Sequence, residues 1–269
     1  MNANVPTLSI VFMAAAAAVC LAIPFILMIW IRRRKGADIL PFFIGFAVFT
    51  LFALVIEGLI NYGVSQTGFG KKLLSNTWTY ALYGGLMAGL FEETGRYIAF
   101  RTVLRRRLGN DANALMYGAG HGGIEAIMTV GVTYVTYIVF AFLINSGNAA
   151  AIMSTVPPEA EEQARAILSQ LTDTPSWMFL VSILERCIAI AAHIAFSVLV
   201  WFAAKKKERV LLYPLAILLH AALDFTVVIL SNKLELPILA VEGALAVLTL
   251  IIVLIAYAVW KRNREPQTV

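Results

Sequence analysis

The stretch Phe91-Glu92-Glu93-Thr94-Gly95-Arg96-Tyr97 places two adjacent carboxylates and an arginine inside an otherwise apolar run. The run starts near Trp78 and continues through Ile98-Ala99-Phe100. If it crosses a bilayer, the charges lie at membrane depth, where a charge is costly and usually serves a function. The rest of the chain should then show the pattern of a membrane protein and supply partners for these charges.

The composition is typical of a membrane protein. Hydrophobic residues make up 60% of the 269 positions and charged residues only 14%, whereas a soluble domain is typically about 45–50% apolar and about 25% charged. The net charge of +5 does not imply a nucleic-acid partner, because basic residues of membrane proteins collect on the cytoplasmic side. Cys20 and Cys187 lie in apolar runs and form no CxxC motif, so no disulfide framework is expected.

Apolar runs of roughly 20 residues, the length that spans a bilayer, recur along the whole chain. We therefore predict an all-α, polytopic transmembrane helical bundle that forms one domain over residues 1–269, with the bilayer as its environment. The predicted spans, about seven, are residues 8–31, 39–61, 75–100, 112–144, 176–204, 209–231 and 236–260.

Four clusters of Lys and Arg follow alternate spans and indicate the orientation. The clusters begin at Arg32, Arg101, Lys205 and Lys261. Because alternation places all four on the same side, the positive-inside rule predicts an outer N-terminus and a cytoplasmic C-terminus. The one long connection, residues 145–175, is acidic and is predicted outside, with a short helix after Pro157-Pro158.

All three histidines of the chain, His121, His193 and His220, fall inside predicted spans and on different helices. Counted at 1.5 Å per residue, these histidines and Glu92 all lie about 12–17 Å from the cytoplasmic edge. A lone intramembrane histidine often only hydrogen-bonds between helices. Three histidines at the depth of a glutamate predict one shared polar site.

The spacing around the glutamate pair suggests which side chains are partners. Glu92 and Arg96 are four residues apart and share a helix face, whereas Glu93 is turned from Glu92 by about 100°. Only one glutamate can therefore point squarely into the site. The spacing gives the same-face arginine to Glu92, but the glutamate that points away is expected to pair with Arg96 or with a neighbouring helix, which would compensate the buried charges. Which glutamate points into the site stays open at this point.

Two histidines have a carboxylate four residues later on the same helix. These pairs are His121 with Glu125 and His220 with Asp224. A histidine and a carboxylate one turn apart can bind one metal ion, or the carboxylate can orient the imidazole.

The ordered motifs resemble those of the YhfC-like intramembrane metalloproteases and, more loosely, those of PrsW-type proteases and type II CAAX prenyl endopeptidases. They are Glu92-Glu93-Thr94-Gly95-Arg96, Gly120-His121-Gly122-Gly123-Ile124-Glu125, and His220 with Asp224. The resemblance covers about residues 40–231 and implies an integral protein of a bacterial cell membrane. Asp224 stands where the prenyl endopeptidases have Asn, and Arg96 is one residue closer to the glutamate pair, which argues against prenylated substrates.

The resemblance also implies hydrolysis of peptide bonds in a membrane-embedded or membrane-adjacent protein. In a metal-dependent scheme the histidines would bind zinc, with Glu125 or Asp224 as a fourth ligand or as a support. Glu92 would be the general base, and Glu93, Arg96 and Asp224 would complete the catalytic set.

A metal-free scheme is also open. There Glu92 and one histidine activate water, while His220 and Asp224 stabilise the oxyanion. The presence of three histidines favours the metal, because the metal-free scheme needs fewer.

Two other classes of protein fit the same residues. Intramembrane His, Glu and Asp also form proton relays and metal pathways in transporters, and Glu57 and Glu242 could extend such a path. Against a transporter, the polar groups form a layer and the chain shows no inverted repeat. The third class is a scaffold that binds a membrane partner without catalysis.

Overall fold

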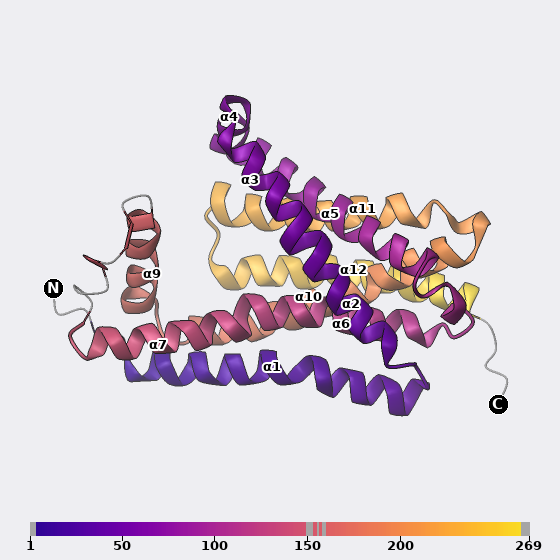
Figure 1. Cartoon of the computed structure of the whole chain (residues 1–269), viewed down its shortest axis with the longest axis horizontal. Helices are drawn as coiled ribbons and strands as arrows, with labels where there is room; N and C mark the ends of the chain where they lie inside the picture. The colour runs from indigo at the N-terminus through magenta and orange to yellow at the C-terminus, as the bar shows by residue number, and fades with distance from the viewer. Residues whose placement is uncertain (1–3, 149–152, 155, 158–159, 265–269) are drawn as a thin grey trace. The chain divides into compact units, whose positions relative to one another are not determined.

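The computed structural model describes residues 4–148, 153–154, 156–157 and 160–264 (Figure 1). Within these ranges the regular structure is helical and no strand occurs, which confirms the all-α prediction. The elements are α1 (Thr7–Lys35), α2 (Leu40–Phe49), η1 (Thr50–Glu57), α3 (Gly58–Gln66), α4 (Gly68–Ser75), α5 (Thr77–Arg101), η2 (Arg105–Arg107), α6 (Ala112–Ala126), η3 (Ile127–Val132), α7 (Thr133–Asn145), α9 (Glu161–Asp173), α10 (Met178–Lys205), η5 (Lys207–Arg209), α11 (Leu212–Val228), η6 (Ile229–Lys233) and α12 (Ile238–Asn263).

Among the described residues, 6 helical stretches are long and apolar enough to cross a membrane. They are Thr7–Lys35, Leu40–Gln66, Ala112–Asn145, Met178–Lys205, Lys207–Lys233 and Ile238–Asn263. The other predicted span, residues 75–100, corresponds to α5, which has 25 residues but carries Glu92, Glu93 and Arg96. Its length suffices for a hydrocarbon core of about 30 Å. The polytopic membrane fold is confirmed, and which side each terminus faces stays a prediction.

Three of the spanning stretches contain a π-helical segment, in which hydrogen bonds run between residues i and i+5. η1 lies between α2 and α3, η3 between α6 and α7, and η6 directly after α11. Glu125 precedes η3, and Asp224 precedes η6. The two histidine–carboxylate spacings therefore lie in regular α-helix.

The chain divides into two compact units, which are described separately. Unit 1 comprises Met1–Ile23 and Ala126–Arg186. Its core includes Val5, Met13, Ala141, Ile144, Leu171 and Phe179. The Val5 amide donates to Asn145 Oδ1 at 2.7 Å, and Asn145 Nδ2 donates to the Val5 carbonyl at 3.0 Å, which ties the N-terminal segment to the end of α7. That residues 1–269 form a single domain stays a prediction.

The connection over residues 145–175 contains α9, as the acidic sequence after Pro157 predicts. Residues 149–152, 155 and 158–159 lie outside the described residues. Glu161 and Glu162 occupy the first turn of α9, where the helix dipole favours negative charge. Placement of this connection outside the cell stays a prediction.

Unit 2 comprises Pro24–Glu125 and Cys187–Val269 and contains every residue of the predicted site. Helices α5 and α11 pack side by side in it (Figure 1). The approach is close because α5 presents glycine there. A Cβ on Gly89 would lie 2.6 Å from the Ile217 carbonyl oxygen, and a Cβ on Gly85 would lie 2.5 Å from that of Ala221. Small residues of this kind allow membrane helices to meet backbone to backbone.

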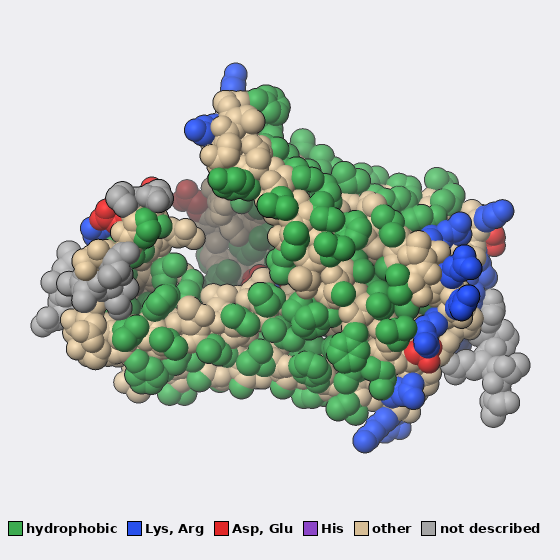
Figure 2. All heavy atoms as spheres, in the orientation of Figure 1, with side chains coloured by type: hydrophobic (Ala, Val, Ile, Leu, Met, Phe, Trp, Pro, Cys, Tyr) green, Lys and Arg blue, Asp and Glu red, His purple; other side chains and the backbone are tan. Residues whose placement is uncertain are grey.

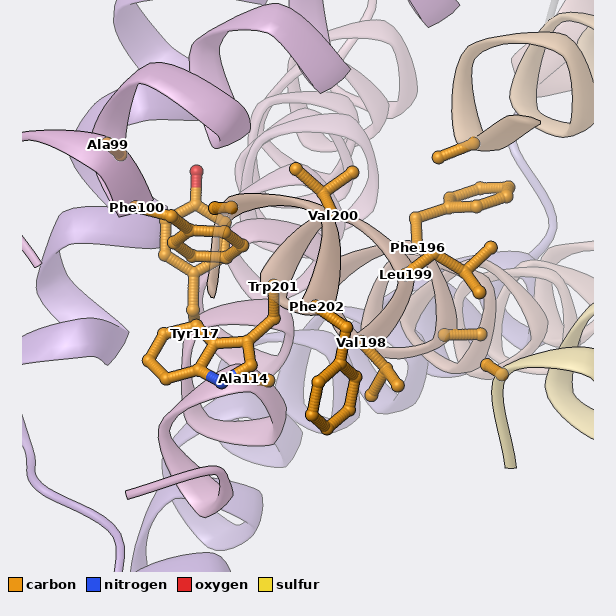
Figure 3. Packing of buried hydrophobic residues seen from close by; sticks show 14 of the residues in the cluster. Ala99, Phe100, Ala114, Tyr117, Phe196, Val198, Leu199, Val200, Trp201 and Phe202 are labelled. Atoms are coloured by element: carbon orange, nitrogen blue, oxygen red, sulfur yellow. The ribbon is translucent and has the colours of Figure 1, made fainter. Parts of the chain in front are cut away.

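A hydrophobic core beside the site holds α5, α6 and α10 together (Figure 3). The Phe100 ring packs edge-on against Tyr117 at 4.7 Å and against Trp201 at 5.0 Å between centroids. Trp201 Nε1 donates to Asp111 Oδ1 at 3.0 Å, and Lys205 Nζ lies 2.9 Å from the same oxygen. Because these three rings are buried, they fix the helices that carry the functional side chains.

The basic clusters of unit 2 meet at one end of that unit (Figure 2). Arg101 Nη1 donates to the Ala204 carbonyl at 3.1 Å, and Lys206 Nζ donates to the Asn263 carbonyl at 3.0 Å. Arg107 Nη1 lies 3.0 Å from Asp38 Oδ2. The C-terminal ends of α5, α10 and α12 therefore lie together, as the alternation of the charged clusters predicts.

Candidate active site

The adjacent glutamates of α5 have different partners. Glu93 and Arg96 form an ion pair in which neither side chain is exposed. Glu93 Oε1 also lies 2.8 Å from His220 Nδ1 on α11. The spacing argument that gave Arg96 to Glu92 is therefore wrong, whereas the expectation that the second glutamate pairs with Arg96 is confirmed: the arginine binds the glutamate three residues before it. Positions i+3 and i+4 both neighbour residue i on a helix, and the position of His220 favours Glu93.

Arg96 joins the glutamate pair to α10. Its Nη2 lies 3.2 Å from His193 Nδ1. Because a guanidinium only donates, His193 Nδ1 must accept and therefore carries no proton. His193 Nε2 lies 2.6 Å from Glu125 Oε2, so Nε2 carries the proton and donates it to that carboxylate. Glu125 on α6 therefore orients His193 on the neighbouring helix α10. It does not orient His121, which lies on its own helix.

One carboxylate oxygen of Glu92 lies beside two histidines. Its Oε2 lies 2.8 Å from His121 Nε2 and 3.8 Å from His193 Nδ1. Its Oε1 makes no hydrogen bond with the described residues. The Glu92 side chain is 9% exposed, whereas that of Glu93 is 0% exposed. Of the two carboxylates, Glu92 is thus the one that a small molecule can reach.

His121 and His193 meet because α6 and α10 approach closely. A Cβ on Gly118 would lie 2.5 Å from Ile194 Cα, and one on Gly122 would lie 3.0 Å from Ile190 Cα. The two imidazole rings are 4.9 Å apart between centroids. The glycines around His121 therefore create the space in which the two rings come together.

His220 lies beside this group on α11. Its ring is 5.4 Å from that of His193 between centroids. Its Nε2 lies 3.6 Å from Asp224 Oδ2, so this i, i+4 pair is within ion-pair distance, as its spacing allows. The structure thus brings together all eight residues singled out in the sequence: Glu92, Glu93, Arg96, His121, Glu125, His193, His220 and Asp224.

Three aromatic residues of the site were missed by the sequence reasoning. Tyr117 packs against His121 with ring centroids 5.8 Å apart, and its ring faces the Arg96 guanidinium at 5.9 Å. Phe49 packs edge-on against His121 at 5.2 Å, and Phe196 stacks on His220 at 4.8 Å. Helical spacing could have suggested Tyr117, which lies four residues before His121. Nothing in the sequence pattern marks Phe49 or Phe196.

The donor atoms of Glu92, His121 and His193 fit a divalent metal ion. One ligand atom from each lies within 4.8 Å of the other two. Two imidazoles and a carboxylate form the protein ligand set of one class of catalytic zinc site, which leaves a position for water. His193 also has the usual orientation of a metal ligand, with its other nitrogen donating to the Glu125 carboxylate. Arg96 donates to His193 Nδ1, so a metal ion and this guanidinium would compete for one lone pair.

Comparison with known proteins finds a family whose model spans the residues of this site. A family model described as YhfC intramembrane metalloprotease matches residues 19–245, which include the whole Glu/His cluster. A Bacillus subtilis (strain 168) protein named "Uncharacterized membrane protein YhfC" is 36% identical over 258 residues, which cover 95% of this chain and 97% of the relative. No solved structure matches the chain. The chain is an integral membrane protein, as both its helices and this relative indicate.

Proposed function

Because the chain belongs to the YhfC intramembrane metalloprotease family, we propose that it hydrolyses peptide bonds of membrane-embedded or membrane-adjacent proteins at the Glu/His cluster. One observation carries the proposal. Glu92 is the reachable carboxylate of the pair, with Oε2 beside two histidines and Oε1 without a hydrogen bond to the described residues. A buried carboxylate with one uncommitted oxygen is suited to accept a proton from water.

The proton transfers of peptide hydrolysis can be assigned to Glu92. As a water oxygen adds to the scissile carbonyl carbon, Glu92 Oε1 takes the proton that the water loses. When the C–N bond breaks, Glu92 returns that proton to the departing nitrogen, so the carboxylate is regenerated. A zinc ion held by Glu92, His121 and His193 would acidify the water and polarise the carbonyl.

The remaining charged residues act as positioning residues. Arg96 holds Glu93 and His193 at once, which fixes α5 against α10. Glu125 keeps the proton of His193 on Nε2, so that the lone pair of Nδ1 stays available to the Arg96 guanidinium or, in its place, to a metal ion. In this proposal Glu125 supports a ligand instead of being one.

The experiment measures cleavage of a membrane-inserted peptide by the purified chain in proteoliposomes. Glu92→Gln keeps the size of the side chain but removes the proton acceptor, and it should lower the cleavage rate by about 100-fold or more. His193→Ala should also abolish cleavage. Glu242→Gln is the matched control, because Glu242 is likewise buried in unit 2 but belongs to α12, which carries none of the eight site residues. Full cleavage by both site variants would overturn the protease assignment.

Metal content tests the ligand set separately from activity. The wild-type chain should contain one divalent ion per molecule, and His121→Ala and His193→Ala should lose it. If the purified chain contains no stoichiometric metal and chelators leave cleavage intact, the metal-dependent part of the proposal fails. Uptake of metal ions or protons by the same proteoliposomes, abolished by Glu92→Gln in the absence of any cleavage, would assign the cluster to transport instead.

A further inference from the structure

A cavity lined by both charged and apolar side chains lies in unit 2 at its basic end, and none of the eight residues of the Glu/His cluster lines it. It has a volume of about 470 Å³ and is formed by the loop before α2 and the loop between α5 and α6. Its lining includes Asp38, Leu40, Val103, Arg106, Arg107 and Asn110. We propose that this cavity, called the headgroup pocket below, binds the phosphate group of an anionic phospholipid.

The walls of the headgroup pocket are fixed by hydrogen bonds from the loop before α2 to Asn110 and to Asn113 in the first turn of α6. The Asp38 amide donates to Asn113 Oδ1 at 2.8 Å, and Asn113 Nδ2 donates to Asp38 Oδ2 at 3.0 Å. Asn110 Nδ2 donates to the Gly36 carbonyl at 2.9 Å. A cavity held in this way exists before a ligand arrives, which lowers the entropic cost of binding.

The charges in the headgroup pocket leave one cation available. Arg107 is paired with Asp38 at 3.0 Å, so these two charges compensate each other. Arg106 makes no hydrogen bond or ion pair with any described residue, and it lines the cavity. A guanidinium binds phosphate oxygens through parallel N–H groups. The pocket therefore attracts an anion in spite of the carboxylate in its wall.

The position of the headgroup pocket indicates a lipid as the source of the phosphate. Leu40 and Val103 line the same cavity and are 40% and 59% exposed. Leu40 begins a candidate membrane span, and Val103 lies two residues beyond the end of α5. A charged group beside exposed apolar side chains at the end of the spans matches an anionic headgroup joined to an acyl chain. Basic pockets between membrane helices commonly bind such headgroups.

The neighbouring residue Arg105 provides a matched control. It lies in the same short helix as Arg106 and carries the same charge. Its side chain also makes no hydrogen bond or ion pair with the described residues, but it does not line the cavity. General attraction of anionic lipids to the basic end would depend on both arginines equally. A specific headgroup pocket depends on Arg106.

The test measures the binding of phosphatidylglycerol and phosphatidylcholine to the full chain in detergent by native mass spectrometry. The wild type should prefer phosphatidylglycerol. Arg106→Gln should weaken its binding by about tenfold or more, as loss of a charge-assisted contact implies, whereas Arg105→Gln should weaken it by less than about fivefold. Inorganic phosphate at equal concentration should not displace the lipid.

Three results would overturn the inference. Equal losses in Arg105→Gln and Arg106→Gln would reduce it to general electrostatic attraction. Equal binding of the two lipids would remove the anion site. Displacement of the lipid by inorganic phosphate would show that the acyl chain contributes nothing and that the ligand is a free phosphate. Unchanged thermal unfolding of both variants, which is expected for exposed side chains, would show that the comparison does not reflect misfolding.

Discussion

The substitution Glu93→Gln removes the counter-charge of a guanidinium with no exposed surface. Glu93 and Arg96 are both 0% exposed, and Glu93 also accepts a hydrogen bond from His220 Nδ1 at 2.8 Å. Glutamine has nearly the same shape but leaves the Arg96 charge uncompensated in the membrane interior. Loss of one member of a buried ion pair typically costs about 3–5 kcal/mol, whereas neutral hydrogen bonds between membrane helices contribute about 0.6 kcal/mol. We therefore expect Glu93→Gln to lower the free energy of unfolding by about 3–5 kcal/mol.

A double-mutant cycle measures this coupling. The free energy of unfolding is determined in mixed micelles by titration with SDS, with tryptophan fluorescence as the signal, for Glu93→Gln, Arg96→Met and the double variant. The double variant carries no buried charge at this pair and should be more stable than the sum of the two single losses predicts. The exposed pair of Glu161 and Arg165 in α9 is the control, because a surface pair contributes only about 0.3–0.5 kcal/mol.

Two results would refute the reasoning. A loss below about 1 kcal/mol in Glu93→Gln would place this pair among neutral hydrogen bonds. Additive losses in the double variant would mean that the two charges do not depend on each other. In either case Glu93 would not be held by Arg96. The assignment of Glu93 to the ion pair and of Glu92 to the proton transfer would then lose its basis.

Two further predictions concern packing and pH. Gly89→Ala would place a methyl group 2.6 Å from a carbonyl oxygen of α11 and should cost about 1–3 kcal/mol in thermal unfolding, whereas Gly84→Ala, with nothing within 4 Å, should be neutral or slightly stabilising. Burial raises the pKa of Asp38, but hydrogen bonds from Asn113 and Arg107 together with the Arg107 charge outweigh it and hold the pKa below its ordinary 3.8. This contribution to the free energy of unfolding is present above pH 3.8 and is lost as the pH falls through the lower folded-state pKa. The free energy of unfolding, measured between about pH 5 and 3, should therefore fall less steeply with falling pH in Asp38→Asn than in the wild type. An identical pH profile of the two proteins would contradict this prediction.

Much of the architecture could be predicted from the sequence, because membranes constrain it strongly. The lengths of the apolar runs predict the spans to within a few residues of their observed ends. The alternation of the basic clusters predicts which helix ends lie together, and these ends meet around Arg101, Lys206 and Arg107. Depth counting along the helices placed Glu92 level with the histidines. Depth depends only on the rise per residue, which is nearly constant in a helix.

The pairing of charges could not be predicted in the same way. Arg96 can reach Glu92 or Glu93 from its own helix, and the choice depends on His193 and His220, which belong to other helices. Likewise Glu125 binds a histidine of α10 although a histidine of its own helix lies one turn away. Spacing within one helix restricts the candidates, but the rotation of neighbouring helices selects among them.

The π-helical segments η1, η3 and η6 have a consequence for comparing this chain with its relatives. Each is a place where a helix accommodates more residues per turn than an α-helix does. Loss of one residue there would convert the segment to regular α-helix and leave the flanking helical faces in register. We therefore expect single-residue gaps in alignments to fall within Thr50–Glu57, Ile127–Val132 and Ile229–Lys233, and chains of slightly different length to retain the same arrangement of Glu92, His121 and His220.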